Sequence, residues 1–340
     1  MFDVASLSDV PAFRCGHAQN ASGGTGCTVI VAPEGATCGV DVRGGGPATR
    51  ETDLLRPENM IEAVHAVVLA GGSAFGLAAS TGVMDELASR GIGFPVGTAH
   101  VPIVVGACLF DLLVGQNVFP DGAMGREATK AALDGDLRTP LAEGNVGAGT
   151  GASVGKLLGG EHAMKSGLGI HGLRMGSLTA VAIVAVNALG CVRGENGSWI
   201  AGCLGDDGLV MDPLASFSLM AAQASEETDP ARSESETQAK AGPCANTTIG
   251  VVLTNAALTK AQATKVSSTV HDAYARAIKP VHTSNDGDTV FTFSSGEVAA
   301  SADAVAVLAT EAMQVAIERA ALEATAAYGL PAALDIAVAR

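Results

Sequence analysis

The sequence predicts an α/β fold, and three observations indicate it. Near-continuous apolar runs occur around 64–70 and 178–189, and such runs are typical of strands that are covered on both faces of a sheet. These strand patterns alternate along the chain with segments whose apolar residues recur at helical spacing. With 43 glycines and only 4% aromatic residues, the chain is also suited to close packing of one backbone segment against another.

The sequence of the first half of the chain predicts one helix and several strands that are separated by turns. The segment TVIVAP, beginning at Thr28, has the composition of a strand, and the glycine-rich segment from Gly35 to Gly46 predicts turns. The next strand, AVHAVVLAGG, leads into the helical pattern SAFGLAASTGVMDELASR, which stops at Gly91. The apolar runs PIVVGACLFDLLVG and LTAVAIVAVNALG predict further buried strands.

The second half contains an abrupt change of composition. From Gln223 to Ala245 the residues are polar and charged, with few apolar anchors, so we predict an exposed, mobile linker over about 223–245. Directly after it, TTIGVVLT has the composition of a buried strand, and a helical pattern follows from about Thr259 to Ile278. A strand, TVFTFSS, and an alanine-rich helix that begins near Ser301 follow.

The overall charge and the cysteines exclude several classes of function. Asp and Glu (35) outnumber Lys and Arg (20), which gives a net charge of -15, so we expect no nucleic-acid partner. The apolar runs are too short to cross a bilayer, so we expect no membrane association. An acidic N-terminus without a signal-peptide pattern favours the cytoplasm. The seven cysteines are scattered without a C-x-x-C pair, as for buried side chains in a reducing compartment.

Four well-known functional motifs are incomplete in this sequence. The glycine-rich segment 147–160 is not a phosphate-binding loop, because Thr150 and Leu157 stand where glycine and Ser/Thr are required. The segment NDGDT lacks the central glycine of a calcium loop, where Phe291 stands instead. Ser73 lacks the flanking glycines of a serine-hydrolase elbow, and no H-E-x-x-H zinc motif occurs. We therefore predict no nucleotide, no metal ion and no other cofactor.

The segment ANTTIGVVLTN, which contains Thr247, remains as a candidate for catalysis. A threonine hydroxyl is a weak nucleophile that needs a base beside it, and a free α-amine on the same residue supplies one. An internal threonine has no such amine, so this mechanism requires cleavage of the peptide bond before Thr247. The polar segment before it would let the new end move away, while the strand behind it would hold the nucleophile. The same residues are also compatible with an ordinary buried strand.

Two carboxylates, Asp286 and Asp288, precede the apolar strand TVFTFSS. Burying them costs free energy unless they have hydrogen-bond partners or a chemical role. The spacing alone leaves two interpretations open, a solvated turn and a pair of functional carboxylates.

Seven motifs, in order along nearly the whole chain, give the sequence a resemblance to a known family. They are GTGCTVI, GVDVRGG, HAVVLAGGSAFGL, GNVGAGTGASVGK, VAVNALG, NTTIGVV and PVHTSNDGDTVF. The sequence resembles the DmpA-type family of self-processing N-terminal-nucleophile hydrolases, which includes L-aminopeptidase/D-esterases, β-peptidyl aminopeptidases and the nylon-oligomer endohydrolase. The resemblance implies that the precursor cuts itself between Asn246 and Thr247, into an α chain of residues 1–246 and a β chain of residues 247–340.

The resemblance also implies roles for other site residues. Asp286 and Asp288 match the family's acidic pair, which would orient and tune the nucleophile by hydrogen bonding. Asn187 matches an asparagine whose side-chain amide stabilises an oxyanion. Lys156 matches an active-site lysine, although it could also be a surface lysine after a glycine turn. Phe110 stands where relatives have a tyrosine near the nucleophile, so it could pack against a substrate but could not donate a hydrogen bond.

The fold and activity of the family complete the expectation. The resemblance implies one hydrolase domain, residues 1–340, with a four-layer αββα sandwich of the type shared with ornithine acetyltransferases, and a homotetramer. The substrate would be a small peptide or amide, with amino-acid amides or esters, β-peptides and oligoamides all open. Two rival functions are an acyl transferase of the ornithine-acetyltransferase type and a non-catalytic scaffold that binds small molecules.

Overall fold

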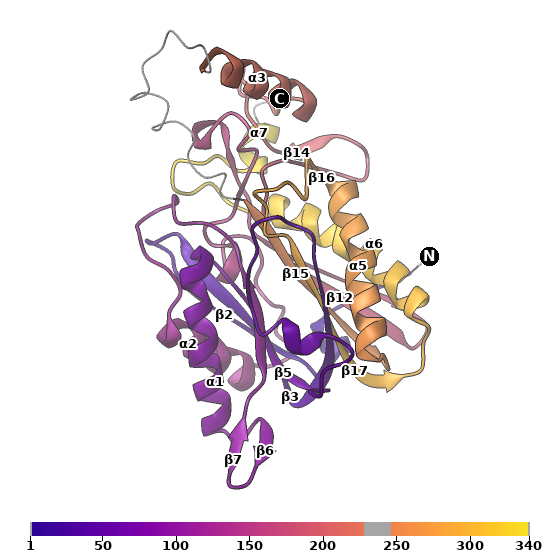
Figure 1. Cartoon of the computed structure of the whole chain (residues 1–340). Coiled ribbons are helices and arrows are strands. Elements are labelled where there is room, and N and C mark those ends of the chain that lie inside the picture. Colours follow the sequence, from indigo (N-terminus) through magenta and orange to yellow (C-terminus); the bar gives the residue numbers. More distant parts are fainter. Residues whose placement is uncertain (1, 228–245, 339–340) are drawn as a thin grey trace.

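One large mixed sheet forms the centre of the molecule. The computed structural model describes residues 2–227 and 246–338, and its main sheet has the strand order β1-β11-β12-β15-β17-β3-β5-β8-β4, with β2 paired to β3 (Figure 1). The bounds of these strands are β1 Asp3–Ala5, β2 Arg14–Asn20, β3 Thr25–Val42, β4 Ala48–Arg50, β5 Val64–Ala70, β8 Val104–Cys108, β11 Leu168–Met175, β12 Leu178–Asn187, β15 Thr247–Ala256 and β17 Thr289–Val298.

The long strand β3 belongs to both parts of this sheet. Its first half pairs with β2 and β5, and its second half pairs with β17. The pairing with β5 shifts register between Val31 and Ala36, and Gly35 between them has a φ of 75°. The predicted turns from Gly35 to Gly46 are therefore wrong as far as Val42. A glycine in the left-handed region allows a bulge that bends the strand without ending it.

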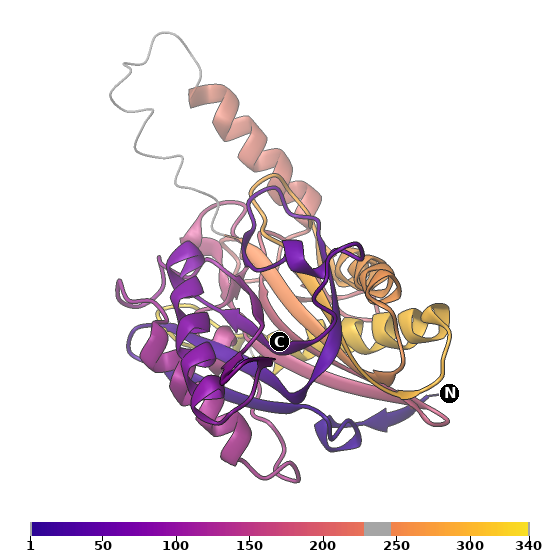
Figure 2. The ribbon, with the colours of Figure 1, turned by 60° about the horizontal axis from the view of Figure 1, so that its bottom comes forward.

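Helices cover the outer faces of the two parts of the sheet (Figures 1 and 2). Helices α5 and α6 lie on the β12–β15–β17 side, whereas α1 and α2 lie on the β2–β5–β8 side. The helices are α1 Ala79–Ser89, α2 Gly122–Asp134, α3 Pro213–Glu227, α5 Lys260–Ala277, α6 Ala302–Leu322 and α7 Ala333–Val338. The shorter strands are β6 Phe94–Val96, β7 Ala99–Val101, β9 Ser153–Val154, β10 Met164–Lys165, β13 Cys191–Arg193, β14 Trp199–Ala201 and β16 Ile278–Lys279.

Three apolar cores separate the resulting four layers. The central core lies between the two parts of the sheet, where Ile30 and Leu69 meet Ile183 and Phe293. A second core joins β12 and β15 to α5 and α6, and a third joins β3, β5 and β8 to α1 and α2. Neighbouring residues of β12 alternate between two cores, as expected for a strand covered on both faces. The four-layer αββα sandwich is therefore confirmed.

Several predicted elements are confirmed, with boundaries that agree to within a few residues. The apolar runs form β5 and β12, in which every residue is buried. Thr259 caps α5 by accepting a hydrogen bond from the backbone N–H of Gln262, and Ser301 caps α6 in the same way through Ala304. The helical pattern that stops at Gly91 begins as a 3-10 helix, Ser73–Ala78, before it becomes α1.

The structure differs from the prediction at the start of the polar segment 223–245. Helix α3 continues to Glu227 and extends away from the body of the molecule (Figure 2), consistent with the helix-favouring Gln, Ala and Glu residues there. The rest of the predicted linker, 228–245, lies outside the described residues. Among the described helices, none combines the length and the apolar character needed to cross a membrane.

Candidate active site

The sheet brings the predicted site residues to one edge. Strand β12 ends at Asn187 where the antiparallel strand β15 begins at Thr247, and these two residues are direct partners in the register. Strand β17 runs parallel to β15 on its other side, so the residues that precede Thr289 lie at the same edge. Because the turn before β17 carries Asp286 and Asp288, the fold itself gathers residues that are up to about 100 positions apart in the sequence.

Thr247 lies buried at the start of β15, with 4% of its surface exposed. Its Oγ1 donates a short hydrogen bond to the carbonyl oxygen of Asn246, the residue before it, and accepts one from the backbone N–H of Gly287 at 3.1 Å. A Cβ on residue 287 would lie only 2.8 Å from this hydroxyl oxygen. A glycine is therefore needed there for the close approach of its backbone to the threonine.

The acidic pair is buried, so the solvated turn that the sequence left open is excluded. Asp286 and Asp288 are 2% and 1% exposed. Asp288 Oδ1 accepts a hydrogen bond from the backbone N–H of Thr248 at 2.7 Å, and Asp286 Oδ2 accepts one from that of Thr283 at 2.6 Å. Burial and the charge of Asp288 raise the pKa of Asp286 to about 6, against the opposing effects of its hydrogen bonds and of Lys156.

Asn187 is the centre of a second group of contacts. Its Oδ1 accepts hydrogen bonds from Lys156 Nζ at 2.8 Å and from the backbone N–H of Ser153 at 3.1 Å. Its Nδ2 donates to the carbonyl oxygen of Phe110 at 2.9 Å. Lys156 therefore contacts a predicted site residue and is not simply a surface lysine. Phe110 contributes a main-chain oxygen to this group, which a tyrosine in its place could also do.

Two buried charged residues of this region were missed in the sequence. Asp111 is 2% exposed and accepts hydrogen bonds from the Gly72 backbone N–H at 2.6 Å and from Thr25 Oγ1 at 2.8 Å. Burial raises its pKa to about 6. An aspartate inside the apolar run LFDLL could have marked it, because an unpaired carboxylate there would be costly. Asp111 directly follows Phe110, so its hydrogen bonds fix the backbone segment whose Phe110 carbonyl oxygen accepts from the Asn187 side-chain amide.

Lys165 is the second missed residue, and it is fully buried. Its Nζ donates to the carbonyl oxygens of Gly149 at 3.1 Å and Ala152 at 3.0 Å, and also to that of Ser166. Burial lowers its pKa to about 7. These hydrogen bonds fix the position of the glycine-rich segment directly before Ser153. The backbone N–H of Ser153 in turn donates to the side-chain oxygen of Asn187. The segment that superficially resembled a phosphate-binding loop therefore supports the site residues.

The glycines after Arg43 lie against the acidic turn. A Cβ on Gly44 would be 2.2 Å from the carbonyl oxygen of Asp286 and 2.5 Å from the backbone nitrogen of Asp288. The backbone N–H of Gly46 donates to that same Asp286 oxygen at 2.7 Å. The sequence motif GVDVRGGG thus lets two backbone segments touch, and their contact sets the position of the carboxylates.

We expect Gly44→Ala to destabilise the protein by about 1–3 kcal/mol, because the new methyl group would overlap backbone atoms that have little room to shift. The measurement is the thermal unfolding midpoint at a fixed scan rate. Gly160→Ala is the matched control, since a Cβ on Gly160 meets no atom within 4 Å. Equal midpoints for the two variants would show that the turn tolerates the methyl group.

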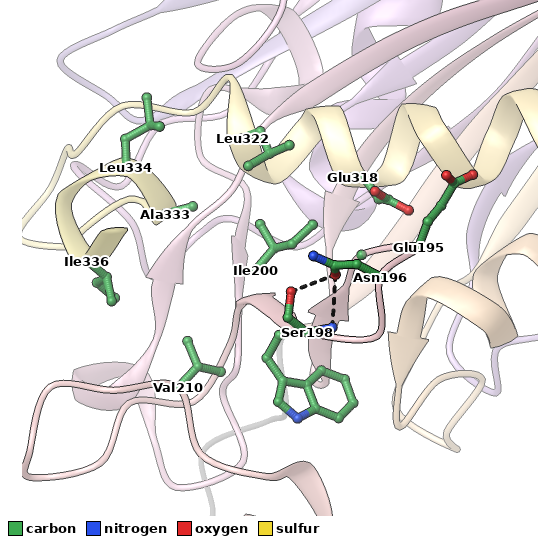
Figure 3. A pocket seen from close by; sticks show the side chains of 12 residues that line it. Glu195, Asn196, Ser198, Ile200, Val210, Glu318, Leu322, Ala333, Leu334 and Ile336 are labelled. Carbon is green, nitrogen blue, oxygen red and sulfur yellow. Dashed lines mark hydrogen bonds between the residues drawn. The ribbon is translucent and has the colours of Figure 1, made fainter. Parts of the chain in front are cut away.

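The structure also contains a groove of about 470 Å³, and Figure 3 shows the side chains that line it. It is lined by residues of the β13–β14 hairpin and of helices α6 and α7, including Trp199, Ile200, Glu318 and Leu334. None of the predicted site residues lines it. Within the described part of the chain, no group of three or more His, Cys, Asp or Glu side chains is arranged to hold a metal ion.

Comparisons with known proteins give consistent matches. The model of peptidase family S58 matches residues 5–332. An uncharacterized aminopeptidase of Mycobacterium tuberculosis is 39% identical over 306 residues, which cover 86% of this chain and 82% of that protein. A 6-aminohexanoate-oligomer endohydrolase of Paenarthrobacter ureafaciens is 30% identical over 292 residues, which cover 85% and 75%.

The fold is similar to that of a solved enzyme from Ochrobactrum anthropi. This L-aminopeptidase D-Ala-esterase/amidase is described as a variant of the Ntn hydrolase fold, and it superposes with a TM-score of 0.61 at 18% identity. The match covers 94% of this chain and 86% of that one. The layers described above are therefore those of an Ntn-type hydrolase fold.

Proposed function

This chain belongs to peptidase family S58 and is a hydrolase of amide bonds, and we propose that it makes its own nucleophile by cutting the bond between Asn246 and Thr247. The matches confirm the family resemblance that the seven motifs indicate. The contact of Thr247 Oγ1 with the Asn246 carbonyl, at the start of a buried strand, carries the proposal. The products are an α chain of residues 1–246 and a β chain of residues 247–340.

Self-cleavage begins from this contact in the uncut chain. The hydroxyl oxygen attacks the carbonyl carbon of Asn246, the hydroxyl proton passes to the nitrogen of Thr247, and the C–N bond breaks. The acyl group is then bound to the threonine oxygen as an ester. Water then hydrolyses the ester, which leaves Thr247 with a free α-amine. The backbone N–H of Gly287 donates a hydrogen bond to Oγ1, and the Asp288 carboxylate accepts one from the backbone N–H of Thr248. These two contacts fix the orientation of the attacking threonine.

Hydrolysis of a substrate then follows with the new amine as the base. The amine, whose ordinary pKa is about 8, takes the proton of Thr247 Oγ1, and this oxygen attacks the substrate carbonyl. In the tetrahedral intermediate that forms, the leaving nitrogen takes a proton from the Thr247 ammonium group and the C–N bond breaks, which leaves an ester on Thr247. Water then hydrolyses this ester. We assign oxyanion stabilisation to the side-chain amide of Asn187, which Lys156, Ser153 and Phe110 hold in place.

The charged residues support these steps. Lys156 lies close enough to Asp286 to oppose the rise of its pKa, and a cation at that place would also favour the neutral, basic form of the Thr247 amine. Asp286 and Asp288 orient the turn that carries Gly287. Phe110 would offer its ring to an apolar part of the substrate.

The substrate is an amide or a peptide small enough to reach the buried hydroxyl. One relative is named an aminopeptidase and another an endohydrolase of 6-aminohexanoate oligomers, so both terminal and internal amide bonds are candidates. The net charge of -15 is compatible with substrates that carry an ammonium group.

We further propose a homotetramer in the cytoplasm. Helix α3 presents three exposed apolar side chains, Leu214, Phe217 and Leu219, which is the kind of surface that association buries. The six described cysteines are buried and unpaired, which suits a reducing compartment.

The proposal is tested by the intact mass of the purified protein under denaturing conditions. We expect two polypeptides, one ending at Asn246 and one beginning at Thr247, with Thr247 as the first residue found by N-terminal sequencing. A single uncut chain in folded protein that nevertheless hydrolyses amides would overturn the assignment of an N-terminal nucleophile.

A further inference from the structure

We propose that His282 is a positioning residue, which holds the carboxylate of Asp288 in the orientation that self-cleavage and hydrolysis require. The inference rests on the proposed function, because it acts through Asp288 on the residue next to the nucleophile. His282 precedes the acidic turn by a few positions and belongs to none of the helices or strands of the described chain.

The carboxylate of Asp288 is held from two sides. On one side, Oδ1 accepts the hydrogen bond from Thr248, directly after the nucleophile. On the other side, Oδ2 accepts two hydrogen bonds from His282, one from its backbone N–H at 3.1 Å and one from its ring Nδ1 at 2.8 Å. Because both oxygens accept hydrogen bonds, the carboxylate cannot rotate without breaking at least one of them. Hydrogen bonds to a carboxylate are among the stronger ones in proteins.

The backbone of His282 is arranged to present both donors to one oxygen. Its φ is 57°, in the left-handed region that residues other than glycine and asparagine adopt at a cost of roughly 1 kcal/mol. A conformation of this kind persists only where surrounding contacts hold it. Here the two hydrogen bonds to Asp288 are such contacts.

The rings of two neutral residues, His271 and Tyr274, pack against the ring of His282. His271 meets it edge-on with ring centroids 4.8 Å apart, and Tyr274 lies nearly parallel to it at 5.9 Å. Burial lowers the pKa of His271 to about 4 and raises that of Tyr274 well above 10, so both are neutral near pH 7. Beyond His271, Asp41 and Arg43 form an ion pair at 3.1 Å.

The polar contacts of the ring point to Asp288. Nε2 of His282 is buried and has no hydrogen-bond partner among the described residues, whereas Nδ1 faces the carboxylate. The ring therefore donates from Nδ1, and the rings of His271 and Tyr274 hold its plane. This arrangement fixes Asp288, and through Thr248 it fixes the start of β15.

Two substitutions separate the donor from the backbone conformation. Asparagine and glycine both tolerate a positive φ, but only asparagine can place an N–H near the position of Nδ1. We expect His282→Gly to slow self-cleavage by about 10- to 100-fold, the effect known for residues that orient a metal ligand by a hydrogen bond, and His282→Asn to restore most of the loss. The measurement is the half-time of the uncut chain after cell-free synthesis, followed on denaturing gels.

The fraction that does become cut gives a second readout. With any chromogenic amino-acid p-nitroanilide that the wild type hydrolyses, His282→Gly should lower kcat with little change in KM, because the proposed role of His282 acts through Asp288 and not through binding of the substrate. Added imidazole should recover part of the rate of the glycine variant. A purely structural role would instead lower the unfolding midpoint of both variants and give no rescue.

The outcomes distinguish this inference from the proposed function. Equal processing and kcat in His282→Gly and wild type would overturn the role of His282 and leave Thr247 as the nucleophile. Equal losses in the glycine and asparagine variants would also overturn it, because the donor would then be irrelevant. Normal cleavage in a Thr247→Ala protein made in the same experiment would overturn the proposed function itself.

Discussion

Thr247→Ala is expected to leave the chain uncut and to lower amide hydrolysis on the order of 10⁴-fold or more. The substitution removes both the hydroxyl that contacts the Asn246 carbonyl and the group that would attack the substrate. Without cleavage there is also no free α-amine to act as a base. The measurements are the intact mass of the protein after prolonged incubation and the rate of hydrolysis of a peptide or oligoamide substrate.

Thr248→Val is the matched control for this experiment. The Thr248 hydroxyl is buried next to the nucleophile but has no hydrogen-bond partner among the described residues, and valine keeps the shape of the side chain. The backbone N–H that donates to Asp288 is unchanged. The control should therefore be cut and active. If Thr247→Ala were processed and active as well, the nucleophile would have to be another residue.

The second large effect is expected for Asp288→Asn, which should accumulate the uncut precursor and slow cleavage on the order of 10²- to 10³-fold. The carboxylate accepts three hydrogen bonds, from Thr248 and His282, and an amide has only one oxygen with which to accept them. At least one buried donor would lose its acceptor, at a cost of about 1–3 kcal/mol for each such group. Denaturing gels over a time course measure the fraction cut.

An exposed aspartate supplies the control for loss of charge. The side chain of Asp53 is 91% exposed and lies 3.4 Å from Arg56, so Asp53→Asn removes one negative charge without disturbing a buried contact. Its processing should equal that of the wild type. Normal processing in Asp288→Asn with an unchanged unfolding midpoint would show that the carboxylate takes no part in maturation.

Much of the fold could be predicted because local patterns determine it. The β-branched runs form buried strands, and Thr259 and Ser301 begin helices as their capping chemistry dictates. The continuation of β3 beyond Gly35 could not be predicted from the sequence, because a bulge and a turn both use a glycine with a positive φ. Which one forms depends on the partner strand β17, which is about 250 residues away in the sequence.

The candidate site divides in the same way. Thr247, Asn187, Lys156 and the acidic pair could be named from motifs, and the structure gathers them at one edge of the sheet. The structural role of Lys165 could not be predicted from the sequence, because its hydrogen-bond partners are backbone carbonyls that no side-chain motif reveals. For the same reason the sequence did not indicate that the glycines after Arg43 press against the acidic turn.

The strand order has a consequence for the enzyme after cleavage. Strands β15 and β17, which belong to the proposed β chain, lie between β12 and β3, which belong to the α chain. The β chain is therefore hydrogen-bonded to strands of the α chain on both sides, and it cannot leave without breaking the sheet. Two chains that were one during folding would therefore remain together as a nicked protein.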